Sequence, residues 1–103
     1  MSVYRDVYEA LAAHQGAGSS RLGPQVRLMK VSEEAGEAMS AYIGVVGANK
    51  RKGVYADGGH VAAELADVVI AAMIAMYDWT DSPEQFLKEH LQALKQRISE
   101  EGS

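Results

Sequence analysis

Five acidic side chains stand in two short groups that could form one metal site: Glu33, Glu34 and Glu37, then Glu64 and Asp67. On a helix, residues three or four positions apart share a face, so each group would place its carboxylates on one flank. Like charges at this spacing repel, and Asp67, expected to be buried within an apolar run, would cost several kcal/mol without a cation. A divalent cation between two facing helices would relieve both problems. An all-oxygen ligand set favours Mg²⁺ or Mn²⁺.

The same glutamates also have an ordinary explanation, because glutamate-rich helices commonly present a solvated face. Spacing alone therefore leaves a solvated face and a metal site as two open interpretations. A di-iron bundle would require a Glu-x-x-His pair on each of two helices. The sequence contains no such pair, which excludes that class of site, and His60 has no partner at metal-ligand spacing.

A short basic segment, 49–53, could bind the outer phosphates of an anionic substrate through Lys50, Arg51 and Lys52. The alternative is a solvated loop that interacts with the dipole at the end of the preceding helix.

Two further residues could contact a nucleotide. Lys30 lies one helical turn before the first acidic group, where it could bind phosphate or pair with Glu34 four residues later. Trp79, the only tryptophan, could stack on a base or belong to the core or to a subunit interface.

The elements that must position these residues are expected to be four helices, over about 2–14, 24–46, 57–79 and 82–99. Alanine is abundant and alternating strand patterns are absent, so helix propensity dominates. Asp57 and Ser82 are expected N-caps, with Pro83 in the first turn of the last helix and Gln85 at its capping-box position.

Composition restricts the protein class. A chain of 103 residues is long enough for one domain, 1–103, with a thin core. The absence of cysteine excludes disulfides, thiolate zinc sites and a cysteine nucleophile, and a net charge of −4 argues against nucleic-acid binding. The longest apolar run has 10 residues, about half a membrane span. A soluble, cytoplasmic protein without a membrane partner is expected.

The third expected helix is apolar on nearly every side, since Asp67 is the only polar side chain between Leu65 and Tyr77. Such a helix must be covered all round. Three other short helices would leave part of it open. We therefore expect an all-α fold in which the second and third helices form an antiparallel pair within a homodimeric or homotetrameric bundle.

The acidic pattern, Glu-Glu-x-x-Glu followed after 26 residues by Glu-x-x-Asp, resembles the signature of the MazG-like all-α nucleoside triphosphate pyrophosphohydrolases. That superfamily includes dimeric dUTPases, dCTP pyrophosphatases and phosphoribosyl-ATP pyrophosphohydrolase. The resemblance covers about residues 24–79. It implies an enzyme that uses Mg²⁺ to cleave the α–β phosphate bond of a nucleoside triphosphate, releasing a monophosphate and pyrophosphate.

The resemblance also implies roles for the acidic residues. Glu33 matches the family position suited to orienting or deprotonating the attacking water. The family's metal-ligand positions are matched by Glu34, Glu37, Glu64 and Asp67. Two alternatives stay open. One is phosphoribosyl-ATP hydrolysis, and the other is a non-catalytic helical interaction module whose acidic cluster binds a structural cation or a basic partner.

Overall fold

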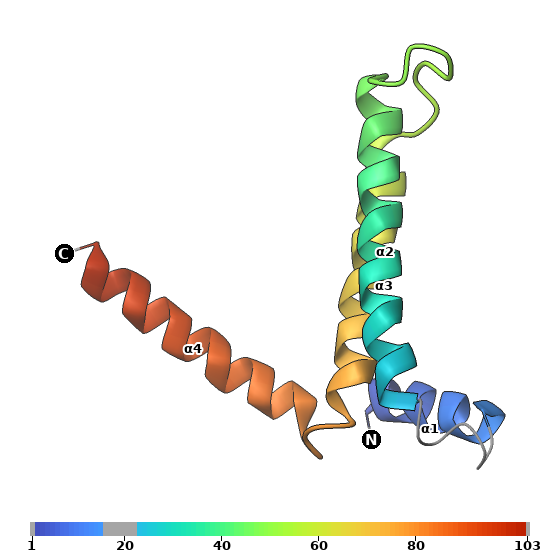
Figure 1. The fold of residues 1–103 in the computed structure, drawn as a ribbon. Coiled ribbons are helices and arrows are strands. Elements are labelled where there is room, and N and C mark those ends of the chain that lie inside the picture. The colour runs from blue at the N-terminus through green and yellow to red at the C-terminus, as the bar shows by residue number, and fades with distance from the viewer. Residues whose placement is uncertain (1, 16–22, 103) are drawn as a thin grey trace.

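The computed structural model describes residues 2–15 and 23–102. These residues form four α-helices and no strand (Figure 1). The helices are α1 (Val3–Gln15), α2 (Gly23–Val46), α3 (Gly58–Met76) and α4 (Pro83–Glu101). The expected all-α class and helix order are confirmed.

Helices α2 and α3 form an antiparallel hairpin that is the centre of the fold, as expected (Figure 1). Its buried hydrophobic residues are mostly small, which lets the two helix axes approach closely: Ala38, Ala41, Met73, Ile74 and Ala75. Gly47 ends α2 with a φ of 67°, a left-handed conformation that glycine adopts without steric cost.

The helix ends agree with expectation in part. Asp57 is the N-cap of α3, and its carboxylate accepts a hydrogen bond of 2.8 Å from the backbone N–H of His60. The third helix was expected to reach Trp79 but ends at Met76 and continues as a turn. The expected capping box of α4 is wrong, because the Ser82 side chain makes no cap hydrogen bond.

A nearly buried ion pair joins α2 to the turn after α3 at the base of the hairpin, and Tyr8 links it to α1. The Arg27 Nε atom lies 2.6 Å from Asp78 Oδ2, and both side chains are almost fully shielded from solvent. The Tyr8 hydroxyl donates to the same carboxylate at 3.0 Å, while the Arg27 guanidinium lies over the Tyr8 ring. Burial alone would raise the pKa of Asp78, but hydrogen bonds from Arg27 and Tyr8 lower it below its ordinary value.

Replacing Asp78 with asparagine should lower the free energy of unfolding by about 3 kcal/mol at pH 7, because the nearly buried Arg27 guanidinium would lose its ion pair with the Asp78 carboxylate. The pKa of Asp78 is lower in the folded chain than its unfolded value of about 3.9. The stability that its ionised carboxylate contributes is therefore fully present above that unfolded pKa, and it is lost as the pH falls through the folded pKa. Urea denaturation at several pH values measures this difference, which should shrink in acid. The exposed Asp81→Asn control should change little at any pH, and an equal loss in both variants would contradict the role of the pair.

The single chain leaves much apolar surface uncovered. Its accessible surface is 7587 Å², about 1,900 Å² more than the roughly 5,700 Å² typical of a folded monomer of this mass. Its radius of gyration is 17.2 Å, against about 13 Å for a compact domain of this length. Helix α4 extends away from the hairpin (Figure 1), and Phe86 and Leu91 on it are exposed.

Helix α3 is long and apolar enough to cross a membrane by length and composition, the one such helix in the described part of the chain. Only 17% of its most apolar window is buried within the chain. The mostly buried core helix of a soluble protein passes the same test. Glu64 and Asp67 lie within α3, and a charge at the centre of a bilayer costs about 2.5–3.5 kcal/mol or more.

Candidate metal centre

Three carboxylates from the two central helices converge on one side of the hairpin. Glu34 and Glu37 lie one turn apart on α2, and Glu64 faces them from α3. One carboxylate oxygen from each residue lies within 4.8 Å of the others. The antiparallel packing thus brings together part of the acidic set that the sequence indicated.

Two oxygens of this cluster are buried without a hydrogen-bond partner among the described residues. They are Oε2 of Glu34 and Oε2 of Glu64. Glu34 is only 8% exposed, and it is the one charged residue in the buried class in the described ranges. Burying a carboxylate oxygen without a donor is costly, so these two oxygens are acceptors that a cation could satisfy.

The cluster also shifts the protonation of its exposed member. The pKa of Glu37 is raised above its ordinary value, first by the negative charge of Glu34, then by desolvation and by the charge of Glu64. Since the folded pKa exceeds the unfolded one, ionising Glu37 as the pH rises costs folding stability. A bound cation would remove this repulsion.

One cation of the chain already neutralises part of the cluster. The Lys30 ammonium lies 2.9 Å from Glu34 Oε1 and 3.3 Å from Glu33 Oε1. These hydrogen bonds, with that to Glu34 the stronger influence, raise the pKa of Lys30 above its ordinary value. The i,i+4 pairing between Lys30 and Glu34 that the sequence allowed is therefore present.

The donor set fits a hard divalent cation. Glu34, Glu37 and Glu64 supply carboxylate oxygens alone, as Mg²⁺ and Mn²⁺ prefer. Two of those residues hold the unpartnered buried oxygens, which a cation would satisfy. These three residues are the part of the expected ligand set that could hold the metal together.

Asp67 has a different place from the one expected. It is exposed in the single chain, so the expectation that it is buried there was wrong. Asp67 lies one helical turn from Glu64 and lines a pocket beside the cluster. Glu34 lines the same pocket. Glu33 is also exposed and paired with Lys30, at the solvent side of the site.

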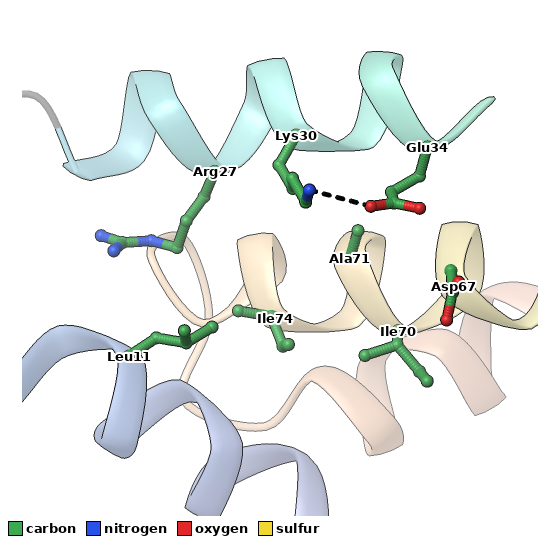
Figure 2. Close-up of a pocket in the computed structure, with 8 residues that line it drawn as sticks. All are labelled: Leu11, Arg27, Lys30, Glu34, Asp67, Ile70, Ala71 and Ile74. Carbon is green, nitrogen blue, oxygen red and sulfur yellow. Dashed lines mark ion pairs between the residues drawn. The ribbon is translucent and has the colours of Figure 1, made fainter. Parts of the chain in front are cut away.

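The pocket lies between α1, α2 and α3 and has a volume of about 280 Å³ (Figure 2). Carboxylates of Glu34 and Asp67 lie toward one end, and the Arg27 side chain lies toward the other (Figure 2). Lys30 also lines the pocket, and the apolar part of its wall consists of Leu11, Ile70, Ala71 and Ile74. The pocket therefore combines charged ends with an apolar wall that could hold an organic group.

Arg27 and His60 were missed by the sequence reasoning. Arg27 lines the pocket, but no local spacing linked it to Asp78, 51 residues away. The sequence reasoning gave His60 no partner at metal-ligand spacing and overlooked its contact with Glu64, whose Oε1 atom lies 3.7 Å from His60 Nε2. That contact could have been found, because His60 and Glu64 are four residues apart on one helix.

The other proposed substrate contacts lie far from the cluster within one chain. Lys50, Arg51 and Lys52 follow the end of α2, and Val46 lies roughly 18 Å along that helix from Glu34 at 1.5 Å per residue. The Asn49 carboxamide accepts hydrogen bonds from two backbone N–H groups of this loop.

Trp79 lies near the opposite end of the hairpin. The residue is 72% exposed and borders an apolar groove with Leu28 and Met76. None of these three residues lines the pocket beside the carboxylates. The groove places Trp79 where a partner surface could cover it.

Comparisons of the chain with protein-family models, with curated proteins and with solved structures gave no match. The resemblance to the MazG-like family therefore depends on the acidic pattern alone. Function has to be inferred from the carboxylate cluster and the pocket beside it.

Proposed function

We propose that this chain is a Mg²⁺-dependent nucleoside triphosphate pyrophosphohydrolase, with Mn²⁺ as a possible substitute metal. It would hydrolyse the α–β phosphate bond to give a nucleoside monophosphate and pyrophosphate. The observation that carries the proposal is the convergence of Glu34, Glu37 and Glu64, with buried carboxylate oxygens that have no donor within the described residues. The acidic pattern in the sequence supports the same reaction class.

The three clustered glutamates would hold the metal, and Asp67 would act at the adjoining pocket wall. Bound Mg²⁺ supplies charge neutralisation for the phosphates and lowers the pKa of a coordinated water. Hydrolysis of a phosphoanhydride depends mainly on such neutralisation and on an in-line nucleophile. Without bound Mg²⁺, the acidic site would repel a triphosphate.

Glu33 is the proposed base. Its exposed carboxylate adjoins the cluster and can accept a proton from water at the solvent side of the site. The water oxygen forms a bond to one phosphorus of the α–β bridge, the bond from that phosphorus to the bridging oxygen breaks, and pyrophosphate separates from the monophosphate. Lys30 and Arg27 are the cations nearest to this chemistry in the pocket lining.

The apolar wall of the pocket, including Leu11 and Ile70, offers surface for the nucleoside. Neither the basic loop, 50–52, nor Trp79 lines the pocket beside the carboxylates within one chain. We therefore place the primary phosphate contacts at the pocket itself.

A product assay tests the proposal. The full chain is incubated with dUTP, dCTP, the four ordinary ribonucleotides and phosphoribosyl-ATP, with Mg²⁺ or with a chelator. We expect pyrophosphate and a monophosphate in equal amounts, and none in the chelator. Preference for phosphoribosyl-ATP would assign the histidine-pathway activity instead. Orthophosphate as the product, or no product from any substrate, would contradict the proposal, and no product together with cation binding would favour a non-catalytic module.

A further inference from the structure

A cation of the chain itself, Lys30, already contacts one member of the carboxylate cluster. The ammonium of Lys30 contacts Oε1 of the nearly buried Glu34, and this is the one ion pair of Glu34 within the described residues (Figure 2). The other oxygen of that carboxylate, Oε2, has no donor there. Glu34 is therefore only partly neutralised, and it is the most buried member of the cluster.

We propose that Lys30 is a built-in counter-cation that opposes divalent metal binding at Glu34 and so sets the metal affinity of the site. This inference rests on the proposed function, since it concerns the same cluster. The ammonium and a metal ion would share one carboxylate, and two positive charges held a few ångströms apart repel. The metal therefore has to displace Lys30 or bind against its charge.

Displacement is feasible because the two partners differ in exposure. The Lys30 side chain is 52% exposed, whereas that of Glu34 is 10% exposed. Lysine has a flexible stem that can carry its ammonium into solvent, but Glu34 is held among packed residues. A metal ion would thus replace a mobile charge at a fixed carboxylate. Removing the competing ammonium should therefore raise the metal affinity only modestly, by roughly fivefold.

Titration calorimetry with Mn²⁺ alone tests the proposal on the full chain, with no substrate present. Lys30→Gln should lower the dissociation constant for Mn²⁺ about fivefold. Lys30→Arg keeps the charge, so its dissociation constant should stay near that of wild type. Lys95→Gln, an equal charge change on exposed α4, should also leave the constant unchanged. In chelator, Lys30→Gln should melt at a lower temperature than wild type, because Glu34 loses its partner.

The outcomes separate the two proposals. The counter-cation role would be overturned if Lys30→Gln bound Mn²⁺ only as tightly as wild type, or more weakly. Either result would leave the metal site in place. Equal tightening by Lys95→Gln would also overturn it, because the effect would then be one of net charge. Failure of both wild type and Lys30→Gln to bind Mn²⁺ would contradict the proposed function, and the counter-cation role with it.

Discussion

Replacing Glu34 with glutamine should reduce Mg²⁺-dependent hydrolysis by at least about 100-fold while the helices stay folded. Glutamine keeps the length of the side chain but replaces a charged oxygen with an amide that donates hydrogen bonds. Glu34 is the buried centre of the cluster, and its Oε2 atom has no donor in the described part of the chain. The substitution would therefore remove a ligand and place N–H or neutral oxygen where the metal needs negative charge.

Initial rates of pyrophosphate release measure the effect, and far-ultraviolet circular dichroism checks the fold. Glu101→Gln, an exposed change at the end of α4, is the matched control and should retain wild-type rates. Activity of Glu34→Gln within twofold of wild type would remove Glu34 from the reaction.

A charge placed in the apolar groove of the hairpin should separate the subunits of the oligomer that we expect. Two adjoining apolar grooves, the one beside Trp79 and a second that shares Ala35 with it, form one face of the hairpin. No charged residue lines either groove. Together they contain Leu28, Val31, Ser32, Ala35, Ala38, Met39, Tyr42, Val61, Leu65, Val68, Ala72, Ala75, Met76 and Trp79. None of them lines the pocket beside the carboxylates. Interface centres are poor in charge and rich in aromatic residues and methionine, as this face is.

The uncovered area favours a second copy of the chain as the partner. The excess of about 1,900 Å² per chain is larger than the roughly 800 Å² that each partner buries in a standard interface, and it is in the range of obligate dimers. Ala35→Glu, in both grooves, should weaken association by about 100-fold, because it would bury an unpaired charge. Ala10→Glu on the exposed surface of α1 is the control.

Sedimentation equilibrium at micromolar concentration measures this effect. We expect wild type and Ala10→Glu at two or more chain masses, and Ala35→Glu at one. A wild-type chain that is monomeric and fully folded would contradict the expectation. A chain that stays in solution only with detergent would instead favour a membrane role for α3, the helix long and apolar enough to span one.

The fold could be predicted from the sequence largely because its signals are local. Alanine content and helix caps such as Asp57 determine where helices begin, and they depend on neighbouring residues only. The capping box at Ser82 was wrong because the hydroxyl makes no cap hydrogen bond, and the third helix gives way to a turn after Met76, since local preferences fix helix ends only to within about one or two residues.

The candidate site could be predicted only in part. Spacing showed which carboxylates share a face of each helix, but the rotation of α2 against α3 decides which ones meet. Glu64 faces the α2 glutamates, whereas Asp67, offset by about 60° around α3, turns toward the neighbouring pocket. The contribution of Arg27 to that pocket depends on a partner 51 residues away, and no local pattern reveals it.

Calorimetric titration of the metal-free chain with Mn²⁺, compared with Glu34→Gln, is the most direct test that the cluster is a metal centre. We expect saturable binding by wild type, with loss of that binding in the variant, since Glu34, Glu37 and Glu64 supply the converging oxygens. Equal binding by both proteins, or binding by neither, would contradict a metal centre at this cluster.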